Sequence, residues 1–197
     1  MVAPRTWRLA AAPVAIGVGL LLLSSGWGLL ALAVAGFVLW FHRDPDRTPP
    51  PRGFLAPADG TVSVIREEGG RVRVGVFMGV TDVHVNRAPV SGSVRSVDHR
   101  PGAHRPAFSK ESDNNERVVM ELDETEVTLI AGSFARRIHP YVTEGDTVER
   151  GDRIGHVSFG SRADVRFPPS VSRSDLEVST GETVTAGETV LASDPTR

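Results

Sequence analysis

The chain has 197 residues, of which about forty at the N-terminus are apolar, leaving room for one further domain of about 150 residues. Its 22 lysines and arginines nearly balance 24 aspartates and glutamates, and a formal net charge of -2 argues against a nucleic-acid-binding protein. The absence of cysteine excludes disulfides, thiolate metal sites and cysteine nucleophiles.

The N-terminal segment predicts membrane attachment. Leu9 to Phe41 is a run of 33 residues without a charge, longer than the roughly 20 that span a bilayer as one helix. Ser24, Ser25 and Gly26 divide it into halves of about 15 residues, each roughly 24 Å long as a helix. The length of the run disfavours a cleaved signal peptide.

Arginines lie on both sides of this run, at Arg5 and Arg8 before it and Arg43 and Arg47 after it. Because positive charge favours the cytoplasmic side, we prefer a helical hairpin over residues 9–41 to one long tilted helix. We therefore expect residues 1–47 to form an anchor and its flank in the cell membrane. The following domain, residues 48–197, should lie on the cytoplasmic side.

Residues 48–197 show the pattern of a mainly β domain. Short segments with alternating or β-branched residues recur, separated by glycine, proline, asparagine and aspartate. These segments are Thr61–Ile65, Arg71–Phe77, Gly92–Val97, Arg117–Leu122, Val127–Ala131 and Arg153–Phe159. We expect a compact, barrel-like β sandwich of mostly antiparallel strands.

Two further segments share one pattern, in which glycines six residues apart enclose a Thr-Val pair. They are Val142–Asp152 and Val178–Glu188, and the spacing predicts a short strand between two tight turns. Lipoyl and biotinyl carrier domains contain similar segments, with the modified lysine at a hairpin tip. The sole lysine here, Lys110, is distant from both segments, which argues against a swinging-arm carrier.

Polar motifs occur in a fixed order from about Phe41 to Pro168. They are Phe41-His42-Arg43-Asp44-Pro45, Pro57-Ala58-Asp59-Gly60, Asp82-Val83-His84-Val85-Asn86-Arg87-Ala88-Pro89, Asn115-Glu116-Arg117, Ile130-Ala131-Gly132-Ser133-Phe134-Ala135-Arg136-Arg137-Ile138 and Phe159-Gly160-Ser161-Arg162. Together, behind an apolar N-terminus, they resemble the short archaeal and bacterial form of the pyruvoyl-dependent phosphatidylserine decarboxylases.

The resemblance implies self-cleavage between Gly160 and Ser161. A serine hydroxyl can attack the preceding carbonyl to form an ester, and a glycine on the acyl side has no Cβ to block the approach. In the family, loss of the serine α-proton then releases the glycine carboxylate, and hydrolysis leaves a pyruvoyl group and ammonia. The expected products are a β chain of residues 1–160 and an α chain of residues 161–197.

The implied reaction converts phosphatidylserine to phosphatidylethanolamine and CO2, through a Schiff base between the substrate amine and the pyruvoyl group made from Ser161. The pyruvoyl group is the only cofactor expected, with no metal. The implied partners are a phospholipid and the membrane, and the oligomeric state stays open. Two alternatives are a pyruvoyl decarboxylase of a serine ether lipid, archaetidylserine, and a non-enzymatic membrane-tethered β module.

His84 is the first choice for proton transfer, because imidazole titrates near neutral pH. Asp59 could orient a histidine as in a serine protease triad. In the long bacterial form a second histidine follows three residues later, where this chain has Arg87. The base for self-cleavage is therefore His84 or another group such as His139 or His104. His84 could instead be structural, and Asp59 could belong to an Asx turn.

A substrate phosphodiester calls for cations, and Arg136 and Arg137 supply adjacent guanidiniums. On a strand these two side chains point in opposite directions, so one of them could reach phosphate. Arg87 and Arg162 are alternatives, unless they pair with acidic side chains, Glu116 or Asp82.

Overall fold

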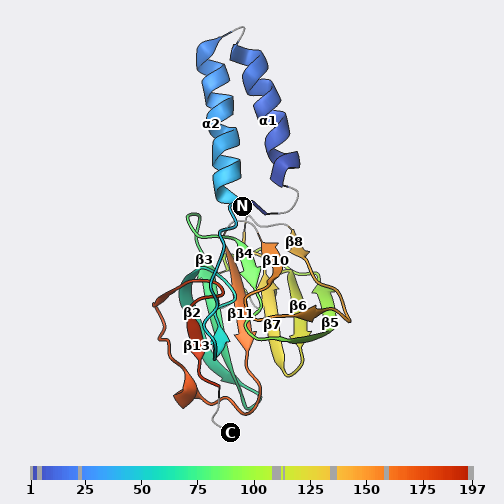
Figure 1. The fold of residues 1–197 in the computed structure, drawn as a ribbon, viewed down its shortest axis with the longest axis vertical. Helices are drawn as coiled ribbons and strands as arrows, with labels where there is room; N and C mark the ends of the chain where they lie inside the picture. The colour runs from blue at the N-terminus through green and yellow to red at the C-terminus, as the bar shows by residue number, and fades with distance from the viewer. Residues whose placement is uncertain are drawn as a thin grey trace. The chain divides into compact units, whose positions relative to one another are not determined.

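The computed structural model describes residues 2–3, 6–21, 24–107, 112, 114–133, 137–157 and 160–194 (Figure 1). By its internal contacts the chain divides into two compact units, Met1–Asp46 and Arg47–Arg197.

The first unit is a pair of helices, α1 (Thr6–Leu21) and α2 (Ser25–Phe41), which lie side by side in Figure 1. Ser24 precedes α2 in an extended conformation, so the helical run is interrupted where the serines predict a break. Glycines allow the helices to approach closely, since a Cβ at Gly28 would lie 2.6 Å from Leu21 Cδ2. In the described part of the chain, no helix is both long and apolar enough to cross a membrane.

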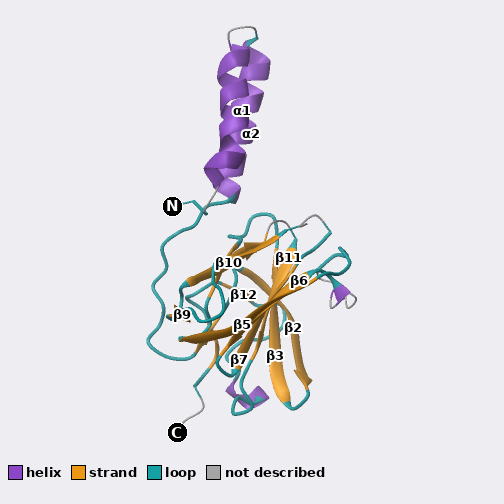
Figure 2. Ribbon diagram, turned by 90° about the vertical axis from the view of Figure 1, so that its right-hand side faces the viewer, coloured by secondary structure: helices purple, strands orange, loops and turns teal. Residues whose placement is uncertain are grey.

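The second unit is built from strands and confirms the predicted mainly β domain (Figure 2). The strands are β1 (Phe54–Leu55), β2 (Gly60–Glu68), β3 (Arg71–Met78), β4 (Val85–Arg87), β5 (Gly92–Arg100), β6 (Arg117–Leu122), β7 (Thr125–Ile130), β8 (Ile138–Pro140), β9 (Thr147–Val148), β10 (Arg153–Val157), β11 (Ser161–Arg166), β12 (Thr183–Val184) and β13 (Val190–Ala192). A short 3-10 helix, η2, spans Arg173–Asp175.

Antiparallel pairing joins these strands into three sheets. The largest has eight strands in the order β12-β2-β3-β11-β7-β6-β5-β9. A three-stranded sheet has the order β4-β10-β8, and β1 pairs with β13. Each of the six predicted β segments overlaps a strand, although the last of them extends into residues 158–159, which lie outside the described residues.

The two glycine-bracketed segments fold as their spacing predicts. Each Thr-Val pair forms a two-residue strand, β9 in the first segment and β12 in the second. The enclosing glycines, Gly145 and Gly151 in the first and Gly181 and Gly187 in the second, all have positive φ. This conformation strongly favours glycine, which explains the recurrence of glycine at these turns.

Strand β11 runs through the middle of the large sheet, between β3 and β7. Side chains alternate across a strand, so Ala163 and Val165 point into the hydrophobic core while Asp164 points to the opposite face. Ser161 shares the parity of Ala163 and is fully buried. The strand that begins at the predicted cleavage bond is therefore covered on both faces.

On the face opposite the core, β11 buries an ion-pair network. Arg162 contacts Asp164 through two bonds, Nε to Oδ1 at 2.7 Å and Nη2 to Oδ2 at 2.9 Å. Arg73 on β3 adds a second cation, with Nη2 2.8 Å from Asp164 Oδ2. Gly75 leaves room for this carboxylate, because a Cβ there would lie 2.5 Å from Asp164 Oδ1.

We predict that Gly75→Ala destabilises the β domain by about 1–3 kcal/mol, because the methyl group must displace a carboxylate fixed by two arginines. Urea unfolding followed by far-ultraviolet circular dichroism measures the change. Gly36→Ala in α2 is the control, since its added Cβ meets nothing within 4 Å. An equal midpoint for Gly75→Ala and the unmodified chain would contradict this account of the network.

Candidate active site

The Gly160-Ser161 peptide forms the entry to β11. Gly160 has φ +62, in the left-handed region that favours glycine, and a Cβ there would meet nothing within 4 Å. Glycine is therefore required by backbone conformation rather than by space. Ser161 is the first residue of β11, with Met78 as its partner on β3, and its Oγ lies 3.9 Å from Met78 Sδ. The hydroxyl of Ser161 is thus buried beside an apolar thioether.

Asn86 contacts the same methionine from β4. Its Nδ2 lies 3.6 Å from Met78 Sδ and 3.4 Å from the carbonyl oxygen of Pro57. The side chain is fully buried, and its Oδ1 has no hydrogen-bond partner among the described residues. A buried amide oxygen without a donor is costly, so this atom is suited to accept a hydrogen bond from a bound group.

Sequence reasoning did not select Asn86. It lies two residues after His84, the spacing that places side chains on one face of an extended chain. This spacing within the Asp-Val-His-Val-Asn-Arg motif is the signal by which it could have been found.

His84 directly precedes β4 and is buried. Its Nδ1 lies 2.9 Å from the carbonyl oxygen of Asp82. A carbonyl only accepts, so Nδ1 carries the proton and donates, which leaves Nε2 as the basic nitrogen of the neutral ring. The His84 carbonyl in turn accepts a bond from the Val157 N–H at 3.4 Å. Val157 ends β10, three residues before Gly160, so the β4–β10 pairing holds His84 beside the segment that leads to the cleavage bond.

Asp59 is held by cationic and backbone donors. Its carboxylate accepts two bonds from Arg47 Nη2, at 3.0 and 2.8 Å, and one from the Ala186 N–H at 2.8 Å. Arg47 also contacts Glu188 at 3.2 Å. The pKa of Glu188 is lowered chiefly by a hydrogen bond from the Thr48 N–H; burial opposes this, and Arg47 lowers it further. The orienting role of Asp59 toward a histidine stays a prediction.

Of the arginines considered as ligands of the substrate phosphate, Arg162 is buried in the interior. It is 2 % exposed, and besides Asp164 its Nη1 contacts Ser112 Oγ at 2.8 Å and the Ala107 carbonyl at 3.3 Å. The alternative that Arg162 pairs with an acidic side chain is supported, with Asp164, two residues along the same strand face, as a partner. Glu116 contacts His99 and His104.

Arg87, which occupies the position of the second histidine of the long form, is also buried. Its Nη1 donates to the Gly151 carbonyl at 3.1 Å. Arg136 lies outside the described residues, as does Lys110. Arg137 is exposed. Its role at phosphate stays a prediction.

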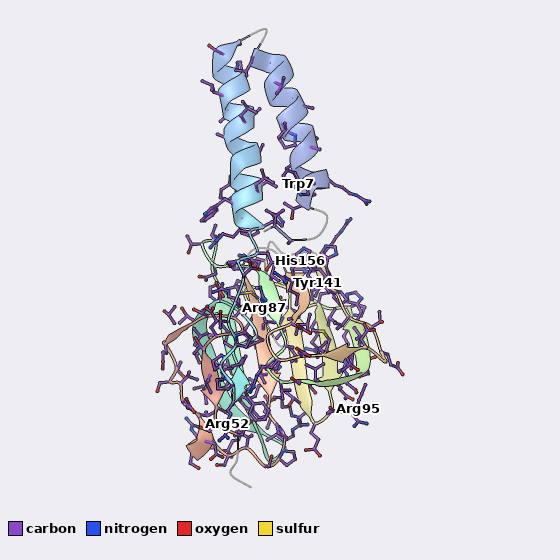
Figure 3. All side chains as sticks on the ribbon, viewed as in Figure 1. Trp7, Arg52, Arg87, Arg95, Tyr141 and His156 are labelled. Atoms are coloured by element: carbon purple, nitrogen blue, oxygen red, sulfur yellow. The ribbon has the colours of Figure 1, made fainter. Side chains whose placement is uncertain are left out.

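The alternative bases fall in different places. His139 lies on β8, opposite His156 on β10, and the two imidazoles stack with centroids 4.6 Å apart. Tyr141 Oη is 2.7 Å from His156 Nδ1 (Figure 3). His104 lies in the segment before β6, with Nε2 3.5 Å from Glu116 Oε2. Of the two, His139 belongs to the sheet that also carries β4.

The assembled residues suit acyl transfer from the Gly160-Ser161 peptide nitrogen to the buried serine hydroxyl. Ser161 follows a glycine in left-handed conformation, the His84 imidazole lies directly before β4, and the buried amide nitrogen of Asn86 contacts the same methionine as Ser161. Burial of the hydroxyl fits a group that must react with its own backbone and then be shielded from water. Among the described residues, no group of three histidines or carboxylates is arranged to hold a metal ion.

Comparison with known proteins gives consistent matches. The family model described as phosphatidylserine decarboxylase matches residues 34–192. A putative archaetidylserine decarboxylase proenzyme of Halobacterium salinarum is 63% identical over 190 residues, covering 96% of this chain and 97% of the relative. A phosphatidylserine decarboxylase proenzyme of Streptomyces avermitilis is 50% identical over 169 residues, covering 83% of this chain and 77% of the relative.

A third relative, a phosphatidylserine decarboxylase proenzyme of Salinibacter ruber, is 45% identical over 187 residues, covering 85% of this chain and 81% of the relative. The family match takes in the β4, β10 and β11 segments that form the site. The resemblance inferred from the ordered motifs is confirmed, and the chain belongs to the phosphatidylserine decarboxylase family.

Proposed function

We propose that this protein removes the carboxyl group of a serine phospholipid headgroup as CO2, using a pyruvoyl group that it makes from Ser161. The observation that carries the proposal is the buried Ser161 at the start of β11, directly after a left-handed glycine, in a chain whose relatives are named decarboxylase proenzymes. The proenzyme names are consistent with a precursor that is processed into two chains.

Maturation begins at the bond between Gly160 and Ser161. Ser161 Oγ forms a bond to the Gly160 carbonyl carbon, the peptide C–N bond breaks, and the freed nitrogen takes a proton. Removal of the Ser161 α-proton then breaks the ester and leaves a carboxylate on Gly160. One water converts the remaining unsaturated residue 161 to a pyruvoyl group, and ammonia departs.

Once formed, the pyruvoyl group supplies an electron sink for decarboxylation of the headgroup. The surrounding residues bind, orient and shield. Met78 lies against residue 161 and excludes water on the side of β3. Asn86 Oδ1 is suited to accept a hydrogen bond from a substrate amine or from a protonated site group. Nε2 of His84 is the nitrogen that takes up or delivers a proton.

A second candidate substrate is archaetidylserine, the serine ether lipid. The relative from Halobacterium salinarum carries that name and is 63% identical over nearly the whole chain. The chemistry at the headgroup is the same for both lipids, and only the linkage of the hydrocarbon chains differs.

We also propose that residues 9–41 anchor the protein in the cell membrane, with a compact, barrel-like catalytic domain on the cytoplasmic side. The support is the uncharged run and its exposed apolar side chains. Leu9, Trp27 and Leu29 are 58%, 65% and 62% exposed, and similar residues continue along both helices. A large exposed apolar surface of this kind is typical of membrane or partner contact.

Self-cleavage is tested by intact mass under denaturing conditions. The purified protein should give two fragments, residues 1–160 and 161–197, the smaller with a blocked N-terminus. Ser161→Ala removes the attacking hydroxyl and should give one uncleaved, inactive chain. A single full-length mass in active wild-type material would exclude the pyruvoyl mechanism.

The role of His84 is tested by His84→Ala. Without the imidazole, decarboxylation should fall by about 100-fold or more, the usual contribution of a positioned acid or base. CO2 release from a serine phospholipid measures the loss, and intact mass reports separately whether cleavage survives. The control is His99→Ala, which removes an exposed ring that contacts Glu116 away from Ser161 and should leave the rate unchanged. Full activity of a folded His84→Ala variant would remove this histidine from the mechanism.

The substrate is tested by comparing diester and diether serine lipids in the same detergent. Because reaction occurs at the headgroup, we expect both lipids to be decarboxylated, with rates that differ less than about ten-fold, the effect of small changes in apolar contact. Turnover of the diether lipid alone would assign the protein to archaetidylserine and reject the diester substrate.

A further inference from the structure

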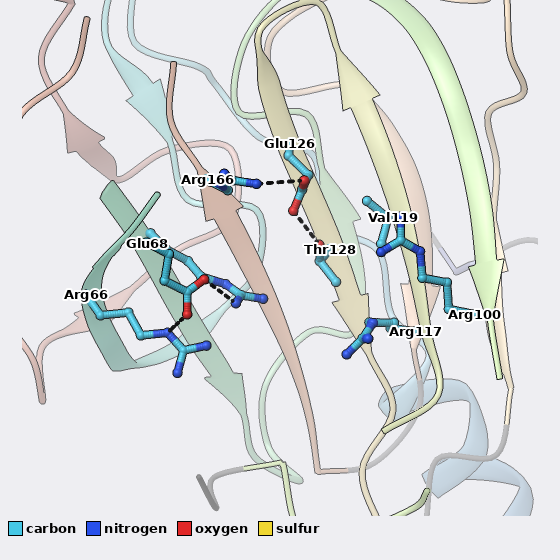
Figure 4. A pocket seen from close by; sticks show the side chains of 9 residues that line it. Arg66, Glu68, Arg100, Arg117, Val119, Glu126, Thr128 and Arg166 are labelled. Carbon is cyan, nitrogen blue, oxygen red and sulfur yellow. Dashed lines mark hydrogen bonds and ion pairs between the residues drawn. The ribbon is translucent and has the colours of Figure 1, made fainter. Parts of the chain in front are cut away.

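The face of the large sheet opposite the core has a depression of about 360 Å3, shown in Figure 4. Five arginines and two glutamates supply its charged lining, contributed by β2, β3, β5, β6, β7 and β11. This volume is within the range of small-ligand sites. The formal charge of the lining is strongly positive, since five guanidiniums face two carboxylates.

Three of these arginines lie side by side across neighbouring strands. Arg66 on β2 is directly opposite Arg73 on β3, and Arg73 is directly opposite Arg166 on β11. Like charges at directly opposed positions of a sheet repel one another. Glu68 contacts both Arg66, at 2.5 Å, and Arg73, at 3.1 Å. Glu126 contacts Arg166 at 3.5 Å, so the two glutamates of the lining are shared among three cations, and Arg73 also contacts Asp164 below.

The other two arginines form a second opposed pair, Arg100 on β5 and Arg117 on β6. Arg100 pairs with Asp98 at 3.9 Å, and both side chains are more than half exposed. Such a pair is screened by solvent and offsets little of the repulsion. Two like-charged rows therefore face one hollow.

Asp164, which lies beneath the hollow, does not reduce the excess of positive charge. Its two oxygens are occupied by Arg162 and Arg73, and Arg162 brings its own positive charge. The neighbouring Thr128 Oγ1 lies 3.3 Å from Glu126, as the dashed line in Figure 4 shows. Five arginines line the hollow beside two glutamates, and a bound anion would lower this excess of positive charge.

We propose that this depression binds a phosphate group, either on a lipid headgroup or on a soluble phosphate. Planar guanidiniums bind phosphate through paired N–H donors, and several around one hollow match its several oxygens. Arg100 and Arg117 form one wall, and the row Arg66, Arg73 and Arg166 forms the other.

The site is separate from the reactive bond. Arg166 lies five residues beyond Ser161 on β11, about 17 Å along an extended strand. The two side chains also have opposite parity, so Ser161 points to the core face and Arg166 to the face with the depression. A phosphate bound here would not occupy the position of the substrate carboxylate.

The test is isothermal titration of the full-length protein in a maltoside detergent, with inorganic phosphate in one arm and dihexanoyl phosphatidylglycerol in the other. The wild type should show saturable binding in at least one arm, weakened by about 0.5 M NaCl. The double variant Arg100→Gln/Arg117→Gln should bind about ten-fold more weakly or not at all. The matched control is Arg95→Gln, an exposed arginine on the same strand that pairs with Asp123 outside the depression, and it should bind as the wild type does.

Binding of phosphate alone identifies a soluble ligand, and binding of the lipid alone or of both identifies a headgroup; each supports the proposal. Absence of saturable binding in both arms, or equal binding by the double variant, overturns it. If the double variant does not fold, Arg100→Gln alone carries the test, because that side chain is 55% exposed. Intact mass of each sample reports self-cleavage separately, so failure at this site is distinct from failure at Ser161.

Discussion

The pairing of β11 with a strand on either side is the constraint on which the proposed chemistry depends. Self-cleavage would turn Ser161 from an internal residue into the end of a chain, and chain ends normally fray. Here the backbone of residues 161–166 is bonded to β3 and β7, each bond contributing about 0.5–1.5 kcal/mol. The bidentate contact between Arg162 and Asp164 also fixes the side chain of the residue next to the new terminus. The reactive group is thereby held in place after its covalent tether is cut.

The two faces of β11 place the reactive serine and the buried charges in separate environments. On one face Ser161 meets a methionine and the hydrophobic core, where a charged group would be costly. On the other face Asp164 and its arginines are buried but mutually paired, so their desolvation is offset. Alternation along a strand is sufficient to keep these environments apart within a few residues.

Local patterns were enough to predict β2, β3, β5, β6, β7 and β10, the two short strands between tight glycine turns and, through ordered motifs, the family. They did not predict β1, β4, β8, β13 or the central strand β11. Side-chain partners were not predictable in the same way. Asp59 binds Arg47 and the N–H of Ala186, which is 127 residues away, and no sequence spacing indicates such a contact. Arg162 was considered for phosphate because of its charge, whereas burial beside Asp164 decides its partner. Asn86 was not predicted, because what distinguishes it is a buried amide oxygen without a hydrogen-bond donor, and only the packing of the folded chain shows this.

The route of the C-terminal segment has a consequence for folding. Residues 161–197 contribute β11 to the middle of the large sheet, β12 to its edge beside β2, and β13 as the partner of β1. After cleavage these three strands would be interwoven with a separate chain, so the fragments could not dissociate without unfolding the domain. Unfolding of the uncut precursor is a unimolecular equilibrium, but refolding of the cut protein would require two chains to meet. After maturation, refolding would depend on the concentration of the two chains, and the folded state would persist through slow unfolding. The uncut precursor would be the form that folds into this topology.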